Sequence, residues 1–166
     1  ARSLRAFLYM KLILKNGSVL EGKSFGAETN ATGEVVFNTG MTGYVESLSD
    51  PSYAGQIVVL TYPLVGNYGV TEKELFESEK MQVAGLVVSE YSEEYSHRDA
   101  KMSLAQWLKD SGVPAMTGVD TRALTKKLRE HGVMLGQLVQ SGPSTSLRVR
   151  KPGPFKDPNE ENLVAN

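Results

Sequence analysis

The sequence contains no cysteine and only two histidines, His97 and His131, among its 166 residues. The missing thiols exclude disulfide bonds, thiolate metal ligands and a cysteine nucleophile from this chain. The two histidines lie far apart and without clustered carboxylates, which does not match the ligand spacing of a zinc site. We therefore expect no bound metal, and few groups remain for chemistry.

The chain also lacks an excess of either charge and lacks long apolar runs. Its 18 basic side chains are balanced by 19 acidic ones, so no positive field attracts nucleic acid. The longest apolar runs, such as residues 57–60, are far shorter than the ~20 residues that span a bilayer. We expect no nucleic-acid partner, no membrane segment, and one domain with a real core, because 40% of the residues are hydrophobic.

The first half of the chain reads as hairpins and loops. Residues 11–15 and 18–25 flank Asn16-Gly17, a dipeptide that suits a two-residue hairpin turn because it tolerates positive φ. Residues 34–39 are rich in β-branched and aromatic residues and are bracketed by glycines, which predicts a further strand.

Two segments in the middle are apolar at consecutive positions, as in strands that are covered on both faces. They are residues 56–62, which we expect Pro63 to end, and residues 83–89. Between them, residues 71–74 have the spacing of a capping box and predict a short helix to about residue 78.

The second half alternates helices and strands, which favours parallel pairing and hence a mixed α/β domain. Pro114 argues for an edge strand or a strand start, and Asp120 and Gly132 are placed to cap and end the second helix. The predicted elements are a helix over 98–111, a strand over 113–117, a helix over 121–130 and a strand over 134–139.

No nucleophile–base pair is visible, so we assign no catalytic residue. His131 falls in the last turn of a predicted helix, where a cation is favoured, and His97 suits a helix cap or an exposed site. Glu93, Glu94 and Asp99 read as a solvated acidic turn.

Two glycine-containing loops are candidates for binding loops. Residues 39–44 could let backbone N–H groups approach a phosphate, but the lysine and the full spacing of a phosphate loop are missing, which favours a backbone-shaping turn. Residues 61–69 follow a buried strand and contain Asn67, which can donate and accept hydrogen bonds. Structural or interface roles suit this second loop best.

The segment Asp50-Pro51-Ser52-Tyr53 has proline at the second position of a turn with aspartate before it, which predicts a rigid type I turn. Such a turn presents Ser52 and Tyr53 at a surface. From the residues alone it is either a stiff corner before the next strand or part of a site.

The chain carries, in this order, the motifs GEVVFNTGMTGY at 33–44, DPSY at 50–53, TYP at 61–63 with GN at 66–67, GVDTR at 118–122, LREHG at 128–132 and DPN at 157–159. Taken together, these motifs resemble the amino-terminal domain of the glutamine-dependent carbamoyl phosphate synthetase small subunit. The sequences of residues 63–69 and 125–129 are similar to fused eukaryotic pyrimidine-pathway versions.

The resemblance implies an α/β fold of three layers, β/β/α, of the swivelling type with mixed sheets. It also implies a division of the chain into an N-terminal extension over residues 1–10, the small-subunit N-terminal domain over 11–140, and an arm and linker over 141–166 toward a glutaminase domain absent from this sequence.

For the whole enzyme, the resemblance implies a ligase that makes carbamoyl phosphate from glutamine, bicarbonate and ATP. Its glutaminase cysteine lies downstream, so the present domain is expected to be non-catalytic and to hold no cofactor, with ATP and Mg bound in the synthetase part. Its expected partners are the downstream glutaminase domain, the large synthetase subunit or domain, and L-glutamine, which Ser52 would contact. The expected compartment is the cytoplasm, with mitochondrion or plastid as alternatives.

Two other functions stay open at this point. A purely structural scaffold would join subunits without touching substrate, and an independent hydrolase would need a catalytic pair that the residues do not offer. The pathway, whether pyrimidine, arginine or urea synthesis, is also left open.

Overall fold

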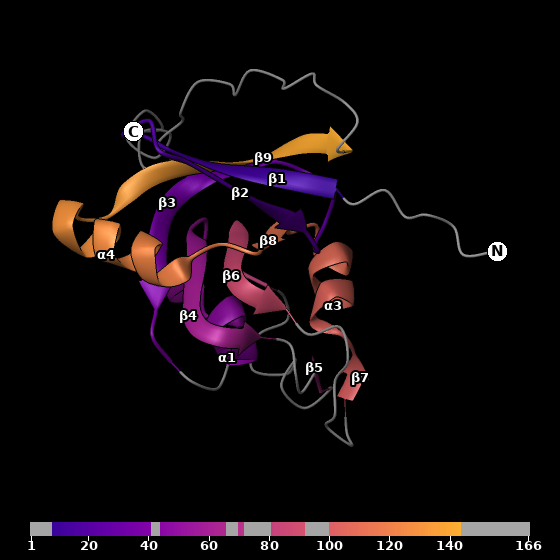
Figure 1. The fold of residues 1–166 in the computed structure, drawn as a ribbon. Coiled ribbons are helices and arrows are strands. Elements are labelled where there is room, and N and C mark those ends of the chain that lie inside the picture. The colour runs from indigo at the N-terminus through magenta and orange to yellow at the C-terminus, as the bar shows by residue number, and fades with distance from the viewer. Residues whose placement is uncertain (1–7, 41–43, 66–69, 72–80, 92–99, 144–166) are drawn as a thin grey trace, which may run out of the picture.

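A computed structural model describes residues 8–40, 44–65, 70–71, 81–91 and 100–143. Its strands form one closed sheet in the order β1-β2-β8-β6-β4-β3-β9, and β9 pairs with β1 to complete the barrel (Figure 1). The strands are β1 Leu8–Leu14, β2 Val19–Ser24, β3 Ala31–Asn38, β4 Ile57–Val65, β6 Gly85–Tyr91, β8 Ala115–Thr117 and β9 Met134–Pro143. A separate pair consists of β5 Val70–Thr71 and β7 Ala100–Met102.

The sheet is mixed, as the sequence predicts. Strands β3, β4, β6 and β8 are parallel neighbours, whereas β1 pairs antiparallel with β2 and β9, and β2 with β8 and β3 with β9 pair antiparallel. The mixed α/β class is therefore confirmed. The three-layer swivelling description is not confirmed, because these strands form a single closed sheet.

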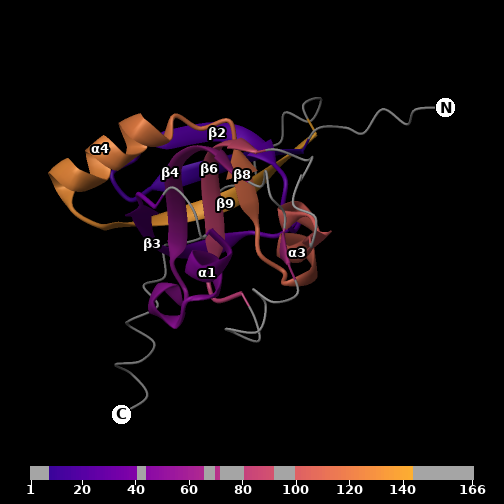
Figure 2. The same cartoon turned by 90° about the horizontal axis from the view of Figure 1, so that it is seen from below.

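The helices lie around the parallel strands. They are α1 Tyr44–Ser49, a 3₁₀ helix Pro51–Tyr53, α3 Leu104–Asp110 and α4 Thr121–His131. Seen from below, α3 and α4 occupy opposite sides of β4, β6 and β8, with α1 near the strand ends (Figure 2). Within the described ranges, no helix is long and apolar enough to cross a membrane.

The hairpin of β1 and β2 is present, but its turn differs from the predicted two-residue form. Gly17 has φ of 91°, no other residue type has positive φ in the described chain, and the Gly17 N–H donates to Leu14 O at 2.9 Å. Asn16 instead uses its side chain, which accepts from the Ser18 N–H at 2.9 Å. One residue with positive φ is enough for this longer loop, whereas a type I′ turn needs two.

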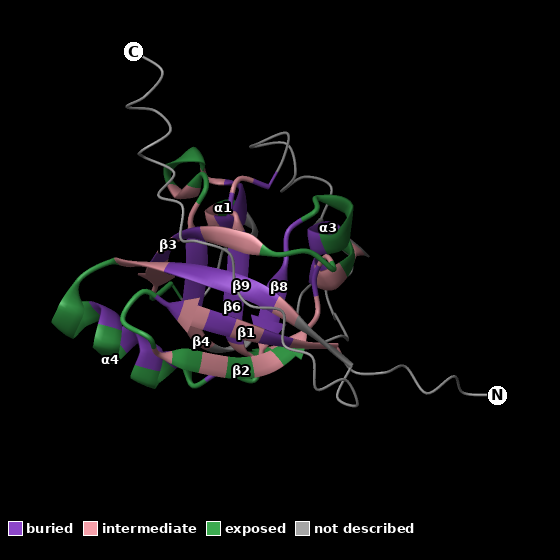
Figure 3. Ribbon diagram, turned by 90° about the horizontal axis from the view of Figure 1, so that it is seen from above, coloured by how far each residue is buried: buried purple, intermediate pink, exposed green. Residues whose placement is uncertain are grey.

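Strand β4 explains why consecutive apolar residues predict a strand covered on both faces. Val58 and Leu60 belong to one buried cluster, which includes Leu104 and Trp107, and Ile57 and Val59 belong to the other. Side chains alternate between faces along a strand, so both faces of β4 are buried. The first four residues of β4 and of β6 are all buried, and Figure 3 shows these strands in the buried interior of the sheet.

The predicted end of this strand at Pro63 is wrong. Strand β4 runs to Val65, although its register against β6 shifts between Leu60 and Leu64. A proline lacks a donor, so the ladder is interrupted at that point rather than ended.

Helix α3 is shorter than the predicted span 98–111. It begins at Leu104, after the Ser103 side chain accepts from the Gln106 N–H at 3.1 Å, and residues 100–102 form β7. A side-chain cap at Ser103 satisfies an otherwise unpaired N–H and starts the helix there. The residues before it are therefore free to pair with β5.

Helix α4 begins as predicted and ends one residue later than predicted, at His131. Asp120 Oδ1 accepts from the Ala123 N–H at 3.1 Å, and Gly132, with φ of 77°, follows the last turn. Leu124 and Leu128 are buried in one cluster with residues of β1, β3 and β4. Strand β8 likewise begins directly after Pro114 and pairs on both sides, so Pro114 marks a strand start.

Several sequence predictions lie outside the described residues or cross their limits. The helix predicted from residue 71 to 78, the loop residue Asn67, and His97 with its acidic neighbours fall there. The barrel itself begins at Leu8 and runs to Pro143, so it takes in a few residues on either side of the predicted domain limits 11 and 140.

Candidate functional site

The turn predicted at residues 50–53 is a single turn of 3₁₀ helix between α1 and β4. Asp50 precedes it with an extended backbone, and Pro51 occupies its first position. Proline is favoured there because its fixed φ suits the helix and its missing N–H would be unpaired anyway. The Tyr53 and Ala54 N–H groups donate to Asp50 O and Pro51 O at 3.0 and 3.1 Å, which closes the turn.

Ser52, the predicted glutamine contact, is exposed and is held by Asp50. The carboxylate oxygen Oδ1 of Asp50 accepts from the Ser52 N–H at 2.9 Å and from the Ser52 hydroxyl at 2.6 Å. These two hydrogen bonds, the hydroxyl bond first, lower the pKa of Asp50 below 3.8. The serine side chain is thus oriented before any ligand arrives.

The pair is suited to binding rather than to nucleophilic attack. A carboxyl group with a lowered pKa is a weak base, so it cannot take the proton from a serine hydroxyl effectively. Because an ionised carboxylate only accepts, the Ser52 hydroxyl is the donor and its lone pairs stay available to a ligand N–H.

Asn38, at the end of β3, ties this turn to the barrel. Its side-chain amide donates to Ser47 Oγ at 3.0 Å and to the Tyr53 hydroxyl at 3.3 Å. Its own Oδ1 accepts from the Gly40 N–H at 2.7 Å, and its backbone carbonyl accepts from the Thr61 hydroxyl at 3.2 Å. One side chain therefore links β3, α1 and the turn.

The chain after the turn also packs closely on β3. A Cβ built at Gly33 would collide with the backbone oxygen of Gly55, which has φ of 73°. Glycine at position 33 lets the two backbone segments approach, and glycine at 55 adopts the left-handed conformation without strain. The turn is fixed on both its sides.

The other candidate residues do not gather at this turn. His131 lies exposed in the last turn of α4, where the sequence places it. In the parts of the chain that the structure covers, no three of His, Cys, Asp and Glu come together in a way that could hold a metal ion. The bonds between Asp50 and Ser52 and from Asn38 to the turn are not predicted from the sequence, although aspartate directly before proline is a typical capping signal.

The fold and this turn define a class of protein: a mixed α/β barrel domain that presents an oriented serine–carboxylate pair on its surface. Comparison with known families adds the relationship. The family described as carbamoyl-phosphate synthase small chain, CPSase domain, matches residues 12–138. The chain belongs to this family.

Related proteins include both fused and separate forms. The multifunctional protein URA2 of Saccharomyces cerevisiae is 49% identical over 93% of this chain and 8% of its own length. The carbamoyl phosphate synthase small chain of Pyrococcus furiosus is 52% identical over 77% of this chain and 36% of its own. The arginine-specific small chain of Saccharomyces cerevisiae is 47% identical over 92% of this chain and 38% of its own. This chain therefore spans only a minor part of each relative.

Among solved structures, an aminopeptidase from Aneurinibacillus sp. strain AM-1 superposes with a TM-score of 0.47 at 14% identity, over 81% of this chain and 30% of that chain. Likeness of this degree supports no conclusion about function.

Proposed function

We propose that this chain is the non-catalytic N-terminal domain of a glutamine-hydrolysing carbamoyl phosphate synthetase. It docks a glutaminase domain to the synthetase part and contributes Ser52 to the glutamine pocket. Membership of the small-chain family and the occurrence of related sequences within fused multifunctional proteins support this assignment. The swivelling three-layer architecture expected for such a domain belongs to the same proposal.

The single observation that carries the substrate contact is the oriented Ser52 hydroxyl. Asp50 holds it at 2.6 Å on a turn that Asn38 and Gly33 fix to the barrel. Glutamine offers N–H donors in its ammonium and carboxamide groups, which match the lone pairs of the hydroxyl and the carboxylate. A prearranged turn contributes such a contact without a further ordering cost.

The scaffold alternative predicts that the same turn only joins domains. Ser52→Ala in the full-length enzyme separates the two functions, because the substitution removes one hydroxyl from an exposed position. We expect the KM for glutamine to rise about tenfold, the size of one hydrogen bond to a charged group, while synthesis from ammonia stays unchanged.

Ser111→Ala is the matched control, since Ser111 is also exposed and lies at the end of α3, away from the turn. An unchanged KM for glutamine in Ser52→Ala would support the scaffold function instead. A loss of ammonia-dependent synthesis would show that the substitution acts on docking.

A further inference from the structure

A hollow lies between helix α4 and strands β3 and β4, near the end of β3. Its volume is about 480 Å³, within the range of small-molecule sites. It shares no residue with the Asp50–Ser52 turn. The described residues that line it are Thr39, Thr61, Arg122, Thr125, Lys126 and Arg129.

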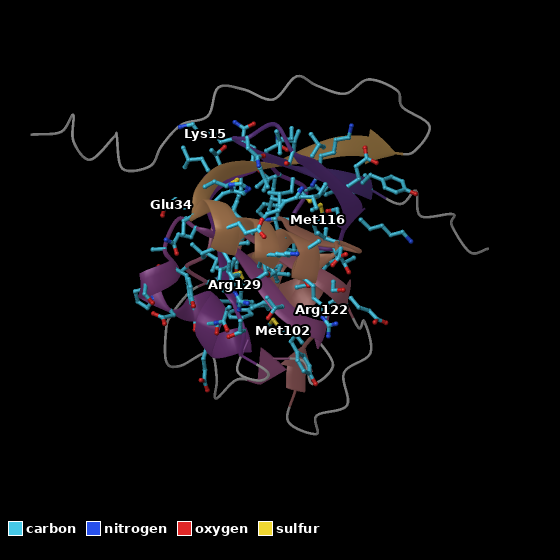
Figure 4. All side chains as sticks on the ribbon, turned by 60° about the vertical axis from the view of Figure 1, so that its left-hand side comes forward. Lys15, Glu34, Met102, Met116, Arg122 and Arg129 are labelled. Carbon is cyan, nitrogen blue, oxygen red and sulfur yellow. The ribbon has the colours of Figure 1, made fainter. Side chains whose placement is uncertain are left out.

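The lining is cationic on one side. Arg122, Lys126 and Arg129 are spaced by four and three residues, so the helical period brings them to one face of α4. Figure 4 shows Arg122 and Arg129 along the same edge of this helix. Within the described chain, none of the three forms an ion pair and no carboxylate lines the hollow.

Thr125 supplies an observation of a different kind. Its side chain lies between the three cations along α4 and is only 6% exposed, yet its hydroxyl has no hydrogen-bond partner in the structure. A buried hydroxyl without a partner costs free energy that a native chain usually avoids. Thr125 is also one of the residues that line the hollow, so a rotation of its side chain about χ1 would let the hydroxyl donate to an acceptor bound there.

The local electrostatics favour the same kind of ligand. Arg122 stands in the first turn of α4, where the helix dipole disfavours a cation, and the carboxylate of the N-cap residue Asp120 is the acidic group that the sequence supplies at this helix start. Arg122 and Lys126 also repel each other at a spacing of four residues. An anion between them would relieve both effects.

The other residues that line the hollow are also consistent with an anionic ligand. The Arg129 guanidinium lies over the Phe37 ring, 5.2 Å from its centroid, which holds the cation beside the barrel. Thr39 directly follows the carboxyl end of β3, and Thr61 lies within β4, one residue beyond its last pair with β3. The carboxyl ends of parallel strands are the edge at which α/β proteins commonly bind ligands. Thr61 already donates to Asn38 O at 3.2 Å, so it shapes the wall rather than donating to a ligand.

We propose that this hollow binds the phosphate group of a small molecule. Guanidinium groups match the geometry of phosphate oxygens, and the ammonium of Lys126 adds a positive charge. The Thr125 hydroxyl would donate a further hydrogen bond. This site shares no described residue with the Asp50–Ser52 turn, although its wall residue Thr61 donates to the carbonyl of Asn38, which anchors that turn.

The test is a titration of the chain with inorganic phosphate. Binding is monitored through the amide resonances of α4 in two-dimensional NMR. Sodium chloride at equal ionic strength controls for screening, and sodium acetate controls for carboxylate binding. We expect saturable shifts with phosphate and weaker ones with acetate. Shifts that never saturate, or that acetate reproduces at equal concentration, would overturn the proposal.

Variants of neighbouring lysines sharpen the test. Lys126→Gln is expected to weaken phosphate binding about tenfold, the effect of one charge-assisted hydrogen bond. Lys127→Gln removes the same charge from the next residue, which is exposed but does not line the hollow, and is expected to change binding less than about twofold. Equal losses in both variants would mean diffuse attraction to the helix and no site.

Thr125→Val distinguishes the hydroxyl from the packing. Valine has nearly the same shape, so the melting temperature in phosphate-free buffer should stay equal or rise, because an unpaired buried hydroxyl is removed. Phosphate binding should nevertheless weaken about tenfold. Unchanged binding in this variant would contradict the proposal.

Discussion

The side-chain amide of Asn38, the last residue of β3, donates a hydrogen bond to the hydroxyl of Ser47 on α1 at 3.0 Å. The same amide reaches the Tyr53 hydroxyl at 3.3 Å. A barrel strand thus holds both the helix before the Asp50 turn and the turn itself. The orientation of Ser52 depends on this anchoring, although Asn38 does not contact Ser52.

Asn38→Ala should therefore weaken the turn. Loss of its hydrogen bonds to a partly buried network is expected to lower the free energy of unfolding by about 2 kcal/mol, measured by urea denaturation. Asn16→Ala, which removes one exposed hydrogen bond in the β1–β2 loop, should cost about 0.5 kcal/mol. Equal effects of the two substitutions would contradict an anchoring role for Asn38.

The ionisation of Asp50 provides a pH test. The Ser52 hydroxyl and N–H bonds lower the pKa of Asp50 in the folded chain below 3.8, so they stabilise the fold above that pH. This stabilisation is lost as the pH falls through the lowered pKa. The carbon resonance of the Asp50 carboxyl should titrate with a midpoint below 3.8.

The same titration in Ser52→Ala separates the two hydrogen bonds. Removing the hydroxyl, the larger cause, should move the pKa of Asp50 upward, while the backbone N–H keeps part of the shift. An Asp50 midpoint that does not move would show that the hydroxyl does not donate to this carboxylate in solution.

The substitution Gly33→Ala tests the close approach of β3 to the backbone of Gly55. A methyl group at position 33 would meet the backbone oxygen of Gly55, which cannot move without the turn, so Gly33→Ala should lower the free energy of unfolding by about 3 kcal/mol. Gly85→Ala is the matched control, because its nearest obstacle is the end of the flexible Leu138 side chain. We expect about 1 kcal/mol there, and a larger loss at Gly85 than at Gly33 would refute the argument.

Helix α4 should depend on its cap. Asp120→Ala removes the acceptor of the Ala123 N–H and is expected to cost about 1 kcal/mol of stability. Ser103→Ala at the start of α3 removes an equivalent bond to the Gln106 N–H and should cost a similar amount. Thermal unfolding followed by Trp107 fluorescence measures both, and no change in either would mean that these caps are dispensable.

The elements that sequence reasoning predicts well are those with local signals. Asp120 and Gly132 mark both ends of α4, and consecutive apolar residues mark β4 and β6 as strands buried on both faces. The predicted start of α3 is too early because the apolar spacing extends to Met102, on the N-terminal side of Ser103. Only pairing with β5 distinguishes residues 100–102 as a strand.

The closure of the barrel and the details of the turn had no comparable signal. Strand β9 pairs with both β1 and β3, which lie far from it in sequence, and no local pattern specifies such pairing. Ser52 is predicted as a glutamine contact only through its motif, whereas its bond to Asp50 and the anchoring by Asn38 depend on distances that only the folded chain provides.

The place of β9 has a consequence for how the domain is made. Because the last barrel strand lies between β1 and β3, both early strands keep an unpaired edge until residues 134–143 have left the ribosome. During synthesis the nascent chain therefore exposes two unpaired strand edges, and the barrel closes only when β9 is available. Translational pausing shortly before this segment would prolong the interval in which aggregation competes with folding.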